Sequence, residues 1–98
     1  MAGSRTNQKH AAHGNLLHQI HDQYIAKNTD YGNSFSETFE HFGLTAPIVR
    51  MWDKLQRIET LSHQTARVKE ESIRDTLLDL ANYAIMTVME LDKRRGNE

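Results

Sequence analysis

The stretch that decides the fold is Leu77-Leu78-Asp79-Leu80-Ala81-Asn82-Tyr83-Ala84-Ile85-Met86-Thr87-Val88-Met89, near the end of this 98-residue chain. On a helix its apolar residues point in nearly every direction, and a helix that is apolar almost all round is buried on most sides. The helical pattern continues over about 70–93, a length on the order of 36 Å. So long a buried helix needs partners from its own chain and from a second subunit.

Two helices are predicted at the start of the chain. Apolar residues at helical spacing place the first over about 15–27, and they are Leu16, Leu17, Ile20, Tyr24 and Ile25. Ser34 followed by Glu37 is a capping-box pattern and predicts that a second helix begins there. The buried edge of this second helix is Phe35, Phe39 and Phe42. Gly43 suits its C-terminal cap.

A third helix is predicted over about 46–62. Thr45-Ala46-Pro47 supplies its cap and a rigid first turn. Its apolar face, read from the helical spacing, is Ile48, Met51, Trp52, Leu55, Ile58 and Leu61. A polar segment over about 63–69 then leads into the last helix.

These segments predict an all-α fold, a helical bundle of about four helices with a long C-terminal helix, completed by oligomerisation. The alternating apolar pattern typical of strands does not occur. Residues 1–13 are small, polar and unpatterned, and predict a disordered tail. Residues 14–95 then form a single helical domain.

Composition excludes several classes of function. Lys and Arg number 12 against 13 Asp and Glu, so a net charge of −1 gives no overall attraction for nucleic acid or an anionic membrane. The absence of cysteine excludes disulfides, thiolate catalysis and Cys-bound zinc, and fits a cytoplasmic protein. No signal peptide or membrane span is predicted, because Asp79, Asn82 and Glu90 break the most apolar run.

An acidic stripe crosses the apolar surface of the last helix. Its members fall within an arc of roughly 80° and are Glu71, Asp75, Asp79 and Asn82. Asp79 and Asn82 are expected to face the bundle interior or a subunit interface, where a carboxylate must meet a cation, a metal or a proton. Hard oxygen ligands favour a site for Mg²⁺ or Mn²⁺, which water and substrate phosphates would complete. The alternative is that the stripe is a solvated face.

Complementary groups lie on the two preceding helices. Glu37 and Glu40 are one turn apart and can face the acidic stripe across the bundle, although the capping box already accounts for Glu37. A basic row within about 60° on the third helix consists of Arg50, Lys54 and Arg57. The basic row suits the phosphates of a di- or triphosphate, or it pairs with the carboxylates of the last helix.

Two weaker patterns also occur. The turn containing Tyr31 and Asn33, with Phe35 after it, suits a wall against a planar base, and packing of these aromatic rings is the alternative. Two His-x-x-His spacings suit a transition metal, although the first pair falls in the predicted tail; they are His10 with His13 and His18 with His21.

Three stretches together resemble the nucleotide-modification-associated domain family. They are Asp30-Tyr31-Gly32-Asn33-Ser34-Phe35, residues 50–61 (RMWDKLQRIETL) and residues 71–84 (ESIRDTLLDLANYA). The resemblance runs from Asp30 to Leu91. That family occurs in bacteriophage and prophage proteins and is similar to the MazG-type all-α NTP pyrophosphatases, which bind Mg²⁺ through acidic residues on facing helices.

The resemblance implies a chemistry for named residues. MazG-type enzymes carry E-x-x-E, matched by Glu37 and Glu40, and then E-x-x-D, whereas this chain has Glu71-x-x-x-Asp75-x-x-x-Asp79. Retained chemistry would use Glu71, Asp75 and Asp79 as the catalytic acids. Together with Glu37 and Glu40, they would hold the metal that activates water against the α-phosphorus. Lys54 and Arg57 would steady the leaving pyrophosphate.

Three interpretations of function remain. The first is a nucleotide-binding protein of phage or prophage type with Mg²⁺-dependent NTP pyrophosphohydrolase activity, whose ligand-binding residues are Tyr31, Asn33, Arg50, Lys54, Arg57 and Asn82. The alternative is a non-catalytic phage module that sequesters a nucleotide signal or binds a host defence protein. The third is a helical dimerisation unit. A cytoplasmic homo-oligomer, dimer or tetramer, is expected in each case.

Overall fold

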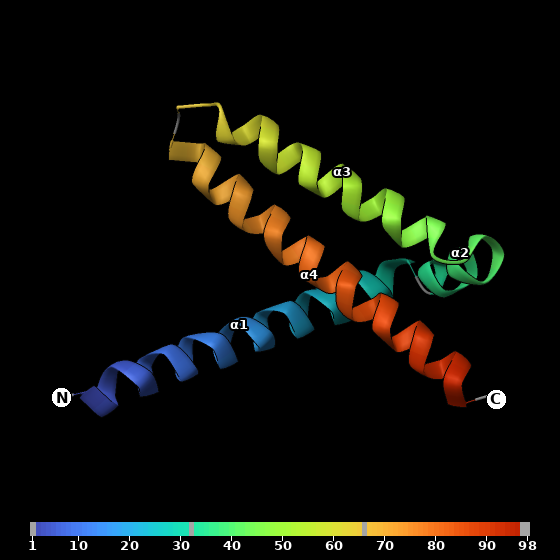
Figure 1. Ribbon diagram of the computed structural model, residues 1–98, viewed down its shortest axis with the longest axis horizontal. Coiled ribbons are helices and arrows are strands. Elements are labelled where there is room, and N and C mark those ends of the chain that lie inside the picture. Colours follow the sequence, from blue (N-terminus) through green and yellow to red (C-terminus); the bar gives the residue numbers. More distant parts are fainter. Residues whose placement is uncertain (1, 32, 66, 97–98) are drawn as a thin grey trace. The chain divides into compact units, whose positions relative to one another are not determined.

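Four helices make up the part of the chain that the structure describes. This computed structural model gives the backbone of residues 2–31, 33–65 and 67–96, and their side chains apart from 2, 3, 30, 31 and 67–69. The helices are α1 (Ala2–Tyr31), α2 (Ser34–Phe42), α3 (Thr45–Ser62) and α4 (Arg67–Gly96) (Figure 1). Strands are absent from these ranges, so the predicted all-α fold with a long C-terminal helix is confirmed. The chain forms two compact units, Met1–Gly32 and Asn33–Glu98, where the sequence predicted one domain over 14–95.

The first unit consists of α1. The sequence predicted a disordered tail over 1–13 and a helix over about 15–27, but the structure has a single helix from Ala2 to Tyr31. The tail was inferred from polarity, yet polar residues such as Gln8 and Lys9, together with Ala11 and Ala12, have high helix propensity. They continue, toward the N-terminus, the helix that the apolar residues after them predict.

Helix α2 begins where the sequence predicts, but without the capping box. Asn33, not Ser34, is the N-cap residue, and no side chain caps the helix. The first turn is closed by the backbone, since the N–H of Glu37 donates to the carbonyl of Asn33 at 3.1 Å. Of the predicted buried edge, Phe39 is 2% exposed and Phe35 is half-buried, but Phe42 is 61% exposed because it lies at the last residue of the helix.

Gly43 ends α2, as the sequence predicts. Its φ of 65° and ψ of −149° lie in a region that is essentially restricted to glycine, and its N–H donates to the carbonyl of Phe39 at 2.7 Å. This conformation ends α2 and begins the short turn that leads into α3.

Gly43→Ala is expected to lower the free energy of unfolding by about 1–3 kcal/mol. No atom lies within 4 Å of an added Cβ, so the cost is conformational and not steric. Gly14→Ala is the matched control, because Gly14 is helical and equally open, and alanine there is expected to be neutral or stabilising. Urea unfolding followed by circular dichroism measures both; equal effects at the two positions would contradict this account of Gly43.

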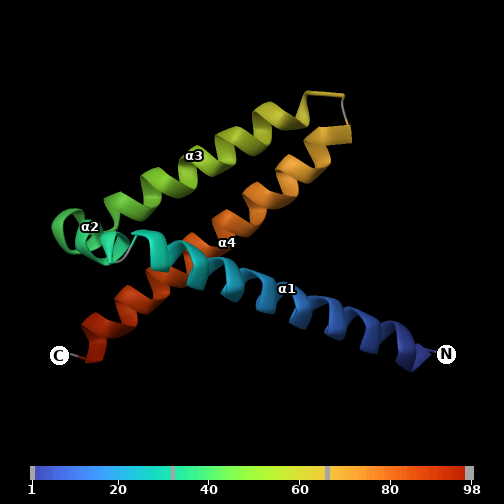
Figure 2. The ribbon, with the colours of Figure 1, turned by 180° about the vertical axis from the view of Figure 1, so that it is seen from behind.

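In the second unit, α3 and α4 form an antiparallel pair that lies side by side in both ribbon views (Figures 1 and 2). Pro47 is fully buried in the first turn of α3, where a missing N–H removes no helical hydrogen bond. Met51, Ile58 and Leu61 are half-buried on the same helix. The pair therefore buries one side of α3.

The rest of the predicted apolar face of α3 stays exposed in the single chain. Ile48, Trp52 and Leu55 each expose half or more of their surface. They lie about a quarter turn or more from the side that faces α4, which a single neighbouring helix does not cover. Exposed apolar residues occur on α4 as well, and they are Leu77, Ile85, Val88 and Met89.

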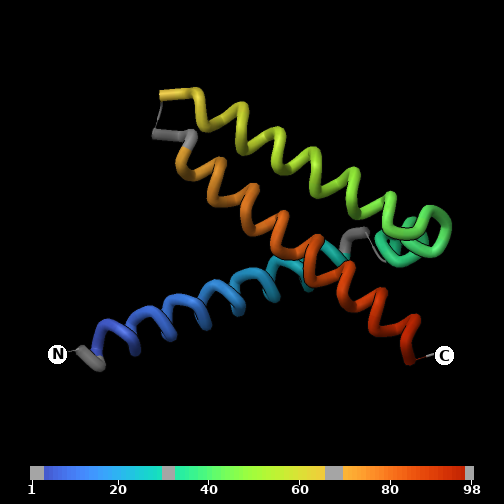
Figure 3. Tube along the Cα trace, in the orientation of Figure 1, coloured from blue at the N-terminus to red at the C-terminus, as the bar shows by residue number. Residues whose placement is uncertain are grey.

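Aromatic contacts hold α2 on α4. Figure 3 shows that α2 lies next to the start of α3. The guanidinium carbon of Arg94 lies 4.7 Å from the centroid of the Phe39 ring. The rings of Phe35 and Tyr83 have their centroids 6.1 Å apart. These two contacts hold α2 against α4.

Candidate functional site

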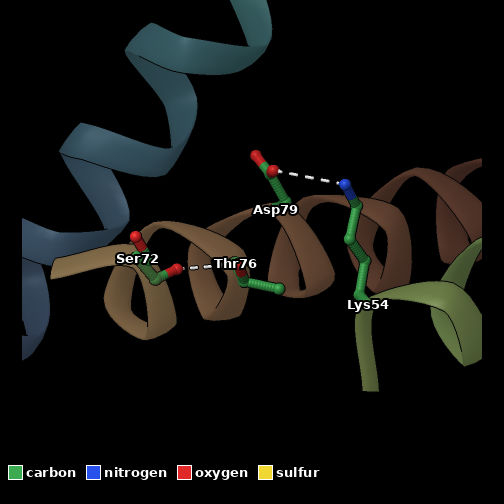
Figure 4. A network of polar contacts seen from close by, with 4 residues as sticks. All are labelled: Lys54, Ser72, Thr76 and Asp79. Carbon is green, nitrogen blue, oxygen red and sulfur yellow. Dashed lines mark hydrogen bonds and ion pairs between the residues drawn. The ribbon is translucent and has the colours of Figure 1, made fainter. Parts of the chain in front are cut away.

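An ion pair joins the basic row of α3 to the acidic stripe of α4. The Nζ of Lys54 lies 3.6 Å from Oδ2 of Asp79 (Figure 4). Both side chains are half-buried, with exposed fractions of 29% and 26%. This distance is longer than the roughly 2.7–2.9 Å of a tight charge-assisted hydrogen bond. The contact is therefore loose and accessible from solvent.

The ion pair fixes the level of the neighbouring charges, because α3 and α4 run in opposite directions. One turn beyond Lys54, Arg57 is level with Asp75; one turn before it, Arg50 is level with Asn82. Arg50, Arg57 and Asp75 are exposed. Cations and oxygen ligands thus follow the same edge of the α3–α4 pair.

The rotation of α4 determines how far each member of the stripe emerges. Thr76 is buried, and its hydroxyl donates to the carbonyl of Ser72 at 2.7 Å, which satisfies this polar group within the helix (Figure 4). Asp79 lies about 60° from Thr76 around the helix and is half-buried. Asp75 lies about 100° away and is exposed. The exposure of the stripe therefore increases toward the N-terminus of α4, from Asp79 to Asp75.

The structure distributes the predicted acidic stripe between buried and exposed positions. Asn82 is 7% exposed and Asp79 is half-buried, in line with the expectation that these two avoid bulk solvent. Glu71 and Asp75 are exposed. The solvated-face alternative therefore describes the N-terminal half of the stripe and not its C-terminal half.

The other predicted site residues are not gathered at this edge by any contact that the structure gives. Glu37 and Glu40 are exposed on α2, and Asn33 is exposed at its start. Tyr31 is the last residue of α1, and its side chain lies outside the described residues. Phe35 packs on Tyr83, which is the packing alternative for that ring. The four histidines of the His-x-x-His pairs are exposed on α1.

A buried carboxylate that the sequence analysis did not single out is Glu90. It is 6% exposed, and its Oε1 lies 3.5 Å from the Nζ of Lys93 one turn later. In the sequence, Glu90 is a break in an apolar run. The apolar residues beside it, Met89 and Leu91, were the available signal, since a charge inside such a run needs a partner.

Two further findings concern metals and membranes. Over the residues that the structure describes, no three carboxylate or imidazole groups come together closely enough to hold a metal ion. Within those same ranges, none of the helices has both the length and the apolar composition that a membrane span requires.

The fold and this edge define a small all-α domain in which an aspartate of a long helix pairs with a lysine of its antiparallel neighbour. The model of the nucleotide modification associated domain 1 family matches residues 27–91, a range that contains the whole acidic stripe and basic row. The chain belongs to this family, as the resemblance predicted. Neither a curated protein nor a solved structure matched the chain.

Proposed function

We propose that the chain binds the phosphates of a nucleotide along the α3–α4 edge and hydrolyses a nucleoside triphosphate with Mg²⁺, as MazG-type pyrophosphatases do. The observation that carries this proposal is the loose pair of Lys54 and Asp79, which puts an ammonium group beside a carboxylate. These are the two kinds of group that a phosphate and a divalent metal ion would use. Membership of a family named for nucleotide modification supports a nucleotide as the ligand. A phage or prophage origin is part of the same proposal.

The acidic stripe suits Mg²⁺ without a cage of protein ligands. Mg²⁺ usually keeps several waters and is held by one or two carboxylates together with substrate phosphates. Asp75 and Asp79 are one helical turn apart on the same side of α4, which is the spacing of neighbouring side chains. Glu71 continues the stripe by one turn, and Glu37 and Glu40 remain candidates for a further ligand. The donor set is all oxygen, as this ion prefers.

The basic row suits the phosphates. Lys54 is a point charge on a flexible stem, and its loose contact with Asp79 leaves it able to turn toward a phosphate when Asp79 binds a metal. Arg50 and Arg57 lie one turn to either side and offer forked donors to phosphate oxygens. Asn82 is level with Arg50, the first residue of this row. Tyr31 and Asn33, proposed to flank the base, stay predictions.

The proposed reaction is the attack of water on the α-phosphorus, which breaks its bond to the bridging oxygen and releases pyrophosphate and a nucleoside monophosphate. Bound Mg²⁺ would activate the water and neutralise the phosphate charge. Lys54 and Arg57 stabilise the negative charge that develops on the leaving pyrophosphate.

A second candidate is capture of a nucleotide without hydrolysis, or binding of a host defence protein. The observation that favours it is the spacing of the acids, four residues apart on α4 in place of the E-x-x-D of MazG-type enzymes, with Glu71 and Asp75 in solvent. Such an arrangement can retain a metal–phosphate contact and lose the position of the attacking water.

Pyrophosphate release and calorimetry separate these functions. The chain is incubated with each common ribo- and deoxyribonucleoside triphosphate and Mg²⁺, with EDTA in a parallel sample. Release of pyrophosphate that EDTA abolishes supports the enzyme. Heat of binding without release of pyrophosphate supports capture. The absence of both signals would contradict a nucleotide ligand.

A further inference from the structure

The side of α4 turned away from the acidic stripe is an apolar surface with charged ends. Leu77, Ala81, Ala84 and Val88 recur at helical spacing along it, and Leu77 and Val88 are 49% and 53% exposed. Ile85 widens the surface and is also exposed. We call this surface the outer face of α4. Ala84 is exposed and Ala81 is half-buried, so most of this apolar stripe is open to solvent, which is typical of a binding surface.

Opposite charges flank the outer face at both ends. Glu70 and Arg74 continue its spacing toward the start of α4, and Asp92 and Arg95 continue it toward the end. All four residues are exposed. Each end therefore carries one acid and one base on the same side of the helix.

The order of these charges matches a second, antiparallel copy of the same helix. When Ala81 faces Ala84 of the second copy, Leu77 faces Val88 and Glu70 faces Arg95, each twice by symmetry. Arg74 then lies beside Asp92. A parallel copy would instead bring Glu70 to Glu70 and Arg95 to Arg95, which like charges disfavour.

We propose that the outer face of α4 is the surface through which two copies of this chain associate. The two α4 helices run antiparallel, and the two-fold axis passes between Ala81 and Ala84. The small alanine side chains at that point let the helix axes approach to the lower end of the usual range of about 8–10 Å. From Glu70 to Arg95 the helix spans on the order of 38 Å, which provides a long line of contact. This inference is independent of the proposed nucleotide chemistry.

The exposed residues on α3 do not show the same self-complementarity. Ile48, Trp52 and Leu55 form an apolar stripe with Glu59 at one end, and no base on that stripe lies at the other. The charge pattern therefore favours α4 over α3 as the self-association surface.

Charge reversal at the two ends tests the pairing. Glu70→Arg alone sets Arg against Arg across the interface, and Arg95→Glu alone sets Glu against Glu. In sedimentation equilibrium each variant by itself is expected to associate on the order of tenfold more weakly than the wild type. An equimolar mixture of the two variants restores both opposite-charge contacts and is expected to regain wild-type association. Each chain in the mixture still carries its single substitution. Recovery of association therefore comes from pairing between the two different variants.

Leu77→Asp, at an exposed position, is expected to weaken association by on the order of 100-fold, while Trp52→Ser leaves it unchanged. Circular dichroism verifies that both variants keep their helices. A wild-type chain that stays monomeric at concentrations of tens of micromolar would overturn the inference. So would a dimer that all of the α4 variants leave intact, or one that only Trp52→Ser breaks, since the latter places the interface on α3.

Discussion

Replacing Phe39 with alanine is expected to lower the free energy of unfolding by about 3–5 kcal/mol, the largest effect on stability that the structure predicts. Phe39 is 2% exposed and is the largest of the fully buried side chains that the structure describes. Alanine would leave a cavity at the junction of α2 with the α3–α4 pair, because a nine-residue helix has little else with which to close it.

The loss extends beyond the cavity itself. The guanidinium of Arg94 lies over the Phe39 ring at 4.7 Å, so the substitution also removes a cation–π contact between α2 and α4. With that contact gone, the tilted packing of Phe35 on Tyr83 still joins α2 to α4, and α2 still packs on α3. The end of α4 that carries the buried Glu90 is expected to fray with it.

Phe42→Ala is the matched control, since it removes the same ring from the same helix at a position that is 61% exposed. It is expected to cost less than about 1 kcal/mol. Urea unfolding at one fixed protein concentration measures both variants, because association changes apparent stability. Equal losses for the two phenylalanines would contradict the packing described for α2.

Asp79→Asn is expected to reduce Mg²⁺-dependent release of pyrophosphate by at least about 100-fold while changing stability by less than about 1 kcal/mol. The substitution keeps the shape of the side chain and removes the charge that holds a metal. The stability effect is small because the pair with Lys54 is loose and partly solvated. A large loss of activity beside a small loss of stability is what a site residue gives and a structural ion pair does not.

Lys54→Met and Glu59→Gln complete this comparison. Lys54→Met leaves the carboxylate of Asp79 in place and removes the proposed phosphate contact, so weaker nucleotide binding is expected. Glu59 is an exposed acid of α3 outside the site, and its replacement by glutamine is expected to change neither binding nor turnover. The site is misassigned if Asp79→Asn and Glu59→Gln behave alike.

Much of the fold was predictable because its determinants are local. Helical spacing of apolar residues located α1, α3 and α4, and the Ser34–Glu37 pattern located the start of α2. Gly43 located the break between α2 and α3, since few other residues adopt its backbone conformation. The start of α1 is not predictable from polarity, because the polar residues of this segment also have high helix propensity. The cap of α2 was also missed, because Ser34 lies inside the helix and Asn33 occupies the N-cap position.

The site was predictable in part. The spacing of residues on each helix predicts the acidic stripe and the basic row separately. Only the packing of α3 on α4 shows that Lys54 meets Asp79. The depth of each acid depends on the rotation of α4, which local sequence does not determine. The burial of Glu90 is unpredictable for the same reason, since it depends on how α4 packs against its neighbours and not on the spacing of residues along α4.

Paramagnetic broadening by Mn²⁺ tests most directly whether the α3–α4 edge is a metal–nucleotide site. Amide resonances of the chain are recorded before and after addition of Mn²⁺ with a nucleoside triphosphate, Mn²⁺ standing in for Mg²⁺. If this edge binds the metal and the nucleotide, broadening is strongest at Asp75, Asp79 and Asn82 and at Lys54 across from them. Broadening that is absent at this edge, or that is centred on the exposed histidines of α1, would contradict it.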